Sequence, residues 1–189
     1  DSSWGLEATL PPGPEMGNFS LRQGRSVEVS GGDIFVGSRQ AIQQFTNQSD
    51  GQWVVRKTFH APSAAAGFGN YLAVHNGVLV TGSDFDSTGG EFAGSAHVFE
   101  EHPPGSGEWS EGERLSAAPP SIGEHFGIGV AVHGQTIAIG AVPNRDGGQI
   151  GSVYIFERAL DGWNLVQNLR ASDEQILDAF GAMVALDNC

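Results

Sequence analysis

Short runs of alternating hydrophobic and small or polar residues recur along the chain, and the clearest one spans residues 126–141. The polar pair Gly134-Gln135 divides this stretch into two halves in which branched residues occupy every second position. This spacing predicts two strands joined by a tight β-hairpin turn. Glycines and alanines lie between the branched residues, so one face of the hairpin is bulky and the other is small. A small face is expected where a neighbouring sheet packs closely.

The tryptophans mark an internal repeat of roughly 50 residues. They are Trp4, Trp53, Trp109 and Trp163. A large apolar residue follows each tryptophan by six positions, and a phenylalanine comes after it. In three copies glycine follows that phenylalanine: Phe68-Gly69, Phe126-Gly127 and Phe180-Gly181. Phe19 departs from the pattern because serine follows it.

Phe19, Phe68 and Phe126 each precede a predicted hairpin, a third strand and then the next tryptophan strand. The third strand lies at 94–99 and 151–156, with a weaker copy at 40–45. A unit of four antiparallel strands is too thin to bury both of its faces alone, which is typical of a propeller blade. Few segments have a helical period, and 28 glycines with nine prolines indicate many turns. The predicted fold class is all-β.

The repeat predicts strand positions in two blades. One blade has strands at 71–75, 78–82, 94–99 and 109–115, and the next at 128–133, 135–140, 151–157 and 163–169. Seven residues of the latter blade are expected to be buried: Val130, Val132, Ile137, Ile139, Val153, Ile155 and Trp163. Phe126 is expected to fill the gap between blades. Because the tryptophans recur at one position of one strand, they are expected to pack blades rather than stack on sugars.

The order and spacing of four elements resemble the FG-GAP repeat. The elements are Phe126-Gly127, the strand end at 139–143 (Ile-Gly-Ala-Val-Pro), the third strand at 151–156 and the tryptophan strand at 163–169. The resemblance covers nearly the whole chain. It implies a β-propeller with blades of four antiparallel strands, of the kind found in integrin α-subunit heads.

The resemblance also implies an organisation into three blades at about 19–59, 68–115 and 126–169, with partial blades at 1–10 and 180–189. Such propellers usually close with seven blades, which needs roughly twice the residues present. The chain is therefore expected to be part of a longer polypeptide, or a portion of a ring completed by a second chain with Cys189 available for pairing. The alternative is a self-contained monomer in which the strands at Trp4 and Phe180 share one blade.

One departure from the integrin-type repeat concerns calcium. Such repeats often carry an aspartate-rich loop between their first two strands. Here that connection is only 75–77 or 133–135, so the chain resembles the metal-free variant, and the resemblance implies no calcium. His75 and His133 occupy equivalent positions of the repeat, where a polar residue is expected to open the hairpin turn.

Ligand contacts are expected on the face with the second-to-third-strand loops and the linkers between blades, because loops vary while strands hold position. These segments are 11–18, 60–67, 83–93, 116–125, 141–150 and 171–179. Asp84, Asp86 and Glu91 offer oxygen ligands of the kind that Ca²⁺ takes. Their spacing misses the Asp-x-Asp-x-Asp-Gly pattern, so a solvated acidic loop is preferred and a calcium site is the alternative hypothesis. No other cofactor is predicted.

The charge of the chain narrows its partners. Asp and Glu number 22 against nine Lys and Arg, and the formal net charge of −13 disfavours nucleic acids and anionic membranes. No segment approaches the roughly 20 apolar residues that span a bilayer. Sequons at Asn18 and Asn47 suit an exported glycoprotein, so an extracellular, secreted or cell-surface location is expected.

The sequence lacks a catalytic constellation. It has no Gly-x-Ser-x-Gly motif, its single cysteine is the last residue, and its histidines show no metal-ligand spacing. We therefore expect a non-enzymatic module that presents a loop-rich propeller face to a protein or glycan partner. Two alternatives stay open: a structural or assembly subunit of a larger complex, and the non-catalytic propeller portion of a larger enzyme.

Overall fold

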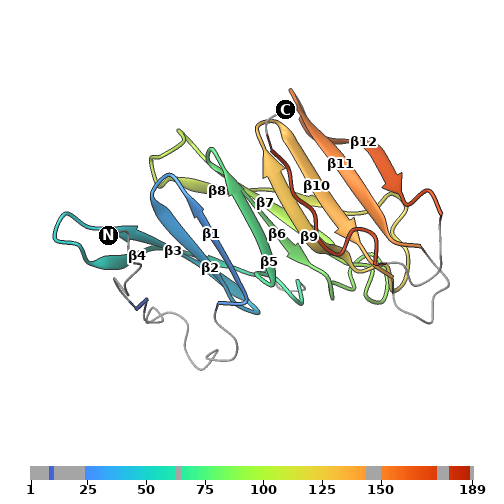
Figure 1. The fold of residues 1–189 in the computed structure, drawn as a ribbon, viewed down its shortest axis with the longest axis horizontal. Coiled ribbons are helices and arrows are strands. Elements are labelled where there is room, and N and C mark those ends of the chain that lie inside the picture. The colour runs from blue at the N-terminus through green and yellow to red at the C-terminus, as the bar shows by residue number, and fades with distance from the viewer. Residues whose placement is uncertain (1–8, 11–23, 63–64, 144–149, 174–178, 188–189) are drawn as a thin grey trace, which may run out of the picture.

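The computed structural model describes residues 9–10, 24–62, 65–143, 150–173 and 179–187. Within these residues the chain is all-β, with twelve strands in three four-stranded antiparallel sheets and no helix (Figure 1). The described part of the chain thus contains no helix that is able to cross a membrane. In each sheet the strands follow one another in sequence order, as in the blades of a propeller.

Each blade is one uninterrupted segment of the chain. The first blade contains β1 (Ser26–Ser30), β2 (Asp33–Gly37), β3 (Ala41–Asn47) and β4 (Trp53–His60). The second blade contains β5 (Tyr71–His75), β6 (Val78–Ser83), β7 (Ser95–Glu101) and β8 (Trp109–Leu115). The third blade contains β9 (Phe126–His133), β10 (Thr136–Ala141), β11 (Ser152–Ala159) and β12 (Gly162–Arg170).

The eight strands predicted for the second and third blades are confirmed to within two residues at each end. Five of the seven side chains expected to be buried in the third blade are buried. Val130 and Ile155 are only half-buried, which corrects the prediction for them. Each packs at the edge of a hydrophobic core rather than at its centre. The strand predicted from Trp4 starts at residues outside those that the structure describes.

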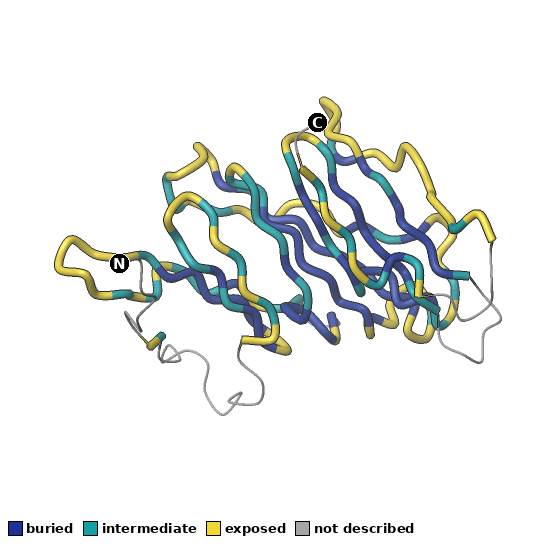
Figure 2. Tube along the Cα trace, viewed as in Figure 1, coloured by how far each residue is buried: buried dark blue, intermediate teal, exposed yellow. Residues whose placement is uncertain are grey.

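The blades meet through their first two strands. β5 packs against β1, and β9 packs against both β5 and β6. The fourth strands lie at the outer rim, where β8 and β12 are largely exposed on both faces. Figure 2 shows the resulting gradient, with buried residues concentrated in the middle strands of the second and third blades. In the second and third blades burial is therefore high in the middle strands and low in the fourth strand at the rim.

A contact between two glycines, repeated three times, fixes the spacing of the blades. The glycine of each Phe-Gly pair places its carbonyl oxygen where the glycine of the preceding blade's second strand would carry a Cβ. The pairs are Gly37 with Gly69, Gly82 with Gly127, and Gly140 with Gly181. Gly127 also has a φ of +98°, a conformation that residues with side chains rarely adopt. The small residues of the hairpins therefore permit main chain to pack on main chain.

Large side chains fill the remaining space between blades. Phe126 is fully buried between the second and third blades, as predicted, and its ring contacts Tyr154 and Phe156 of the third blade. Phe68, at the equivalent position, is fully buried between the first and second blades. Both blade interfaces therefore use one phenylalanine in the same way.

The small face of the third blade's hairpin is covered by the segment at 179–187. Ala131 and Ala138 of that face form a cluster with Phe180, Val184 and Leu186. This packing explains the many small residues at 126–141. A strand was expected from Phe180 onward, but residues 179–187 form turns and irregular structure.

Candidate functional site

The loop between β6 and β7 carries the three carboxylates of the calcium hypothesis. Asp84 and Asp86 are buried, at 2% and 1% exposure, whereas Glu91 is exposed. Among the described residues, no three His, Cys, Asp or Glu side chains form a group that is able to hold a metal ion. The structure therefore does not assemble Asp84, Asp86 and Glu91 as ligands. The preferred picture of a solvated acidic loop is wrong for the two aspartates, because main chain and side chains enclose them.

Asp86 has a structural role in this loop. Its Oδ1 accepts hydrogen bonds from the Thr88 N–H at 2.8 Å and the Thr88 hydroxyl at 2.6 Å. Its Oδ2 accepts from the Ser95 hydroxyl at 2.6 Å and from Arg114 at 2.8 Å. Burial by itself raises the pKa of Asp86, but these hydrogen bonds outweigh it and lower the pKa to about 2. The carboxylate ties the loop to β7 and β8.

His97 borders the same network without forming a catalytic site. Its Nε2 lies 3.3 Å from the hydroxyl of Ser95, but that hydroxyl donates its proton to Asp86. Burial, followed by the nearby charge of Arg114, lowers the pKa of His97 to about 4. Ser95 is fully buried, and the Asp86 carboxylate holds its hydroxyl proton. The serine, histidine and aspartate form a polar core.

A cavity of about 480 Å³ lies on the face where ligand contacts were expected. The linker before β9 and the β11 and β12 strands line it. The hydroxyl of Tyr154 donates to Glu124, which also accepts the N–H of Ser121 at 3.0 Å. Burial, followed by the hydrogen bond to Glu124, raises the pKa of Tyr154, so its hydroxyl stays protonated. No buried side-chain atom of its described lining residues lacks a hydrogen-bond partner.

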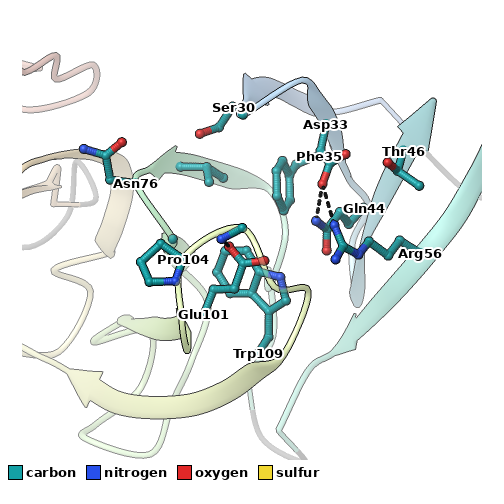
Figure 3. Close-up of a pocket in the computed structure, with 14 residues that line it drawn as sticks. Ser30, Asp33, Phe35, Gln44, Thr46, Arg56, Asn76, Glu101, Pro104 and Trp109 are labelled. Atoms are coloured by element: carbon teal, nitrogen blue, oxygen red, sulfur yellow. Dashed lines mark hydrogen bonds and ion pairs between the residues drawn. The ribbon is translucent and has the colours of Figure 1, made fainter. Parts of the chain in front are cut away.

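A second cavity, the inter-blade pocket, has a volume of about 330 Å³ and lies between the first and second blades (Figure 3). The first blade contributes Ser30, Gly31, Asp33, Phe35, Gln44, Thr46 and Arg56. The second blade contributes Val74, Asn76, Gly77, Glu101, Pro104, Gly105 and Trp109. Most of these residues lie at the first-to-second-strand and third-to-fourth-strand turns. The pocket therefore lies on the face opposite to the one expected to bind ligands.

The charged groups of the inter-blade pocket already have partners. Gln44 Nε2 donates to Asp33 Oδ2 at 2.6 Å, and Arg56 Nη1 lies 3.5 Å from the same oxygen. Arg56 also donates to the carbonyl oxygen of Ser106 at 2.6 Å, which links the two blades. The carboxylate of Glu101 accepts the N–H of Gly105 at 2.6 Å and closes its own turn. These groups shape the walls of the pocket.

Two residues that line the pocket each carry a buried side-chain atom with no hydrogen-bond partner among the described residues: Gln44 Oε1 and Trp109 Nε1. Gln44 is 1% exposed, and its amide orientation is fixed because the Asp33 carboxylate accepts but does not donate. The Trp109 ring is held edge-on against Phe35 and Phe59, at 5.9 and 5.4 Å between centroids. An unpaired buried polar group costs about 1–3 kcal/mol. Two lining residues of the pocket therefore carry one unpaired acceptor and one unpaired donor.

The interface between the second and third blades is closed at the equivalent place. There, Trp163 Nε1 donates to Glu100 at 3.3 Å. Arg158 pairs with the same carboxylate and lies over the Trp163 ring, 5.3 Å from its centroid. Glu100 and Arg158 together fill the space beside the tryptophan.

The sequence of the repeat explains why the first interface stays open. Thr46 follows Phe45 in β3 just as Glu100 follows Phe99 in β7, so a short side chain replaces the carboxylate. Glu101 lies opposite Trp109 in the sheet, the position that Arg158 has opposite Trp163. The first change removes the acceptor of the tryptophan N–H, and the second removes the cation that lies over the tryptophan ring. Both changes leave space beside Trp109.

Comparison with protein families identifies a known repeat in part of the chain. The model of the FG-GAP repeat matches residues 109–156, from β8 through most of β11. Residues 109–156 are thus similar to an FG-GAP repeat. The sequence expectation of FG-GAP propeller blades is thereby confirmed, and the pair Phe126-Gly127 lies inside the matched residues.

Two further comparisons complete the picture. No match was found among curated proteins. Among solved structures, the crystal structure of the N-terminal domain of Nup159 is similar at 13% identity and a TM-score of 0.30. The match covers 75% of this chain and 47% of that one, so the chain spans about half the length of the structure it matches.

The second and third blades also meet through two histidines at equivalent hairpin turns. The rings of His75 and His133 stack at 4.1 Å between centroids with an interplanar angle of 26°. His75 Nδ1 accepts the N–H of Gly134 at 3.0 Å. Burial, followed by the proximity of His133, lowers the pKa of His75. The expected turn role holds, and the stacking between blades is a further role that the sequence did not indicate.

Sequence reasoning missed the pocket residues. Gln44 lies in β3 between the apolar residues Ile42 and Phe45. A glutamine in such a strand is only a weak sign of a polar site in the interior. The stronger sign of the pocket is that the first blade has Thr46 at the position where the second blade has Glu100. Of the predicted glycosylation sites, Asn47 is exposed at the end of β3, and Asn18 lies outside the described residues.

Proposed function

We propose that this chain is a non-catalytic interaction module of the extracellular space that binds a protein or glycan partner. Its FG-GAP propeller fold supports a role in interaction. The observation that carries the proposal is the inter-blade pocket, whose rigid strands hold an unfilled acceptor on Gln44 and an unfilled donor on Trp109. Polar groups that converge in a preformed concave site are typical of ligand recognition.

The chemistry of the pocket supports binding rather than catalysis. General acid or base catalysis needs a titratable group free to exchange a proton with the substrate. Asp33 already accepts a hydrogen bond from Gln44 and neighbours Arg56, and Glu101 accepts a backbone N–H of its own turn. Both carboxylates therefore serve the structure of the site.

Two features support an extracellular location. Asn47 begins a sequon, and its exposed position at the end of β3 leaves room for a glycan. The net charge of −13 keeps the module away from nucleic acids and anionic membrane surfaces, which attract basic proteins. This negative charge fits a neutral or cationic partner.

Binding arrays test this function. The folded chain, labelled at its amino terminus, is applied to one array of extracellular protein domains and one array of glycans. We expect saturable binding to members of one array, abolished by heat denaturation of the chain. Absence of saturable binding to both arrays by a cooperatively folded sample would overturn the proposal. Hydrolase or lyase turnover that depends on Asp33 or Glu101 would overturn its non-catalytic part.

A further inference from the structure

We infer that the inter-blade pocket takes a neutral sugar ring, bound through neighbouring hydroxyl groups to Gln44 Oε1 and Trp109 Nε1. This inference rests on the proposed function, because it names the ligand class of the same pocket. A hydroxyl both donates and accepts a hydrogen bond, so hydroxyl groups satisfy an orphaned acceptor and an orphaned donor at once. In Figure 3 Gln44 and Trp109 extend from different blades toward the same space.

The charge of the pocket selects against anionic ligands. Asp33 and Glu101 line it, against the single cation of Arg56. The Arg56 guanidinium is already held by Asp33 and by the Ser106 carbonyl. A phosphate or carboxylate ligand would meet two carboxylates in a partly desolvated site, which costs binding energy. An uncharged ligand avoids this cost.

The size and the apolar wall of the pocket fit a ring. About 330 Å³ lies at the small end of ligand pockets, enough for a sugar ring with its substituents. Phe35 and Trp109 give the pocket an aromatic wall beside its polar groups. The C–H faces of a sugar pack on aromatic rings while its hydroxyls reach polar atoms. Asn76 and Thr46 add further groups that hydrogen-bond hydroxyls at the rim.

A peptide fits the two orphaned atoms less well. In a trans peptide group the N–H and the C=O point in opposite directions. One peptide group therefore does not present its donor and its acceptor on the same side. A hydroxyl group both donates and accepts, and neighbouring hydroxyls lie side by side on one ring, which favours the sugar.

The chain itself supplies the design of a blocking variant. In the closed interface, Glu100 accepts the indole N–H of Trp163. Thr46 holds the equivalent position beside Trp109, so Thr46→Glu is expected to occupy the pocket and to satisfy Trp109 Nε1 from within. Thr46→Val is the matched control, because it keeps the size of the side chain and leaves the pocket open. Thr46 lies on the half-buried end of β3, so both variants are expected to fold.

The test is nuclear magnetic resonance of the full chain labelled with ¹⁵N. Each tryptophan gives one indole N–H signal, and Trp109→Phe assigns the signal of the pocket. Methyl glycosides of glucose, galactose, mannose, fucose and N-acetylglucosamine are titrated separately. We expect at least one glycoside to shift the Trp109 signal saturably, with a dissociation constant of about 1 mM or lower, and to leave the Trp163 signal in place. Thr46→Glu should weaken this binding at least tenfold, whereas Thr46→Val should weaken it less than threefold.

Each of the other outcomes has a definite meaning. If no glycoside shifts the Trp109 signal at about 50 mM, the sugar assignment is overturned, and binding on the protein array would leave the module function intact. If N-acetylglycine amide shifts the signal and no glycoside does, the ligand class is a peptide and the inference is wrong. A glycoside whose affinity is unchanged by Thr46→Glu binds elsewhere, which also overturns it. Failure on the arrays together with failure here removes the module function itself.

Discussion

The carbonyl oxygen of Gly127 occupies the place that a Cβ would take on Gly82, so the third blade is seated directly on the main chain of the second. A parallel bridge between Gly94 and Phe126 lies beside this contact. Main chain on both sides leaves no flexible side chain to yield. The distance between blades is therefore set by backbone contact, and hydrophobic side chains fill the space that remains.

The contact between Gly82 and Gly127 gives the first prediction. Gly82→Ala should lower the free energy of unfolding by about 3 kcal/mol or more, at or above the upper end for overpacked sites, because the new methyl group meets backbone. Urea denaturation followed by tryptophan fluorescence measures it. Gly134→Ala is the control: it has a φ of +58° and open space around it, and should cost only about 1–2 kcal/mol. Equal losses of unfolding free energy in the two variants would show that Gly82 and Gly127 are not in close contact.

Phe126 gives the second prediction. Phe126→Ala should lower the free energy of unfolding by about 3–5 kcal/mol, because the ring is fully buried between two blades and leaves a cavity. Leu160→Ala, in the fully exposed β11–β12 turn, should change the free energy by less than about 0.5 kcal/mol. A loss within error for Phe126→Ala would contradict its position in the core.

The buried His97 predicts loss of stability in mild acid. Its pKa is lowered from 6.5 to about 4 in the folded chain, so the unfolded chain binds the proton first as the pH falls. Full stability is present above about pH 6.5 and declines until about pH 4, by about 3 kcal/mol in total. Urea denaturation at several pH values measures the slope. His97→Gln, which does not titrate, should show a flatter dependence across this window, and an unchanged slope would assign the effect to other groups.

Calcium titration tests the acidic loop. We expect at most weak binding to Asp84, Asp86 and Glu91, because a metal ion would have to compete with the contact between Asp86 and Arg114. Isothermal titration calorimetry with CaCl₂ gives the affinity. Micromolar binding that persists in the triple variant Asp84→Asn, Asp86→Asn, Glu91→Gln would place a site elsewhere in the chain.

The strands were predictable because the same residue pattern occurs in each copy of the repeat. Phe68, Phe126 and Phe180 lie at matching positions, so errors in one copy are corrected by the others. Strand ends and the burial of Phe126 follow from that register. The half-burial of Val130 was not predictable, since alternation assigns a face but not a distance from the edge of the core.

The candidate site was harder to predict, because its parts are ordinary residues far apart in the sequence. Gln44 and Trp109 are separated by 65 positions and come from different blades. Asp86 is likewise buried by partners from β7 and β8, above all Arg114, so an acidic loop was mistaken for a solvated one. Only alignment of the repeats with one another, Thr46 against Glu100, contains the information that one interface is open.

The gradient of burial within each blade also governs how such a protein changes over generations. Apart from Trp109, Leu115 and Trp163, substitutions on β8 or β12 touch little of the interior, whereas those at the glycine contacts disturb two blades at once. Mutational drift is therefore tolerated at the rim and purged at the glycine contacts. Two differences, at the levels of Thr46 and Glu101, distinguish the open interface from the other one. The architecture thus lets a lineage acquire or lose binding specificity while its fold stays constant.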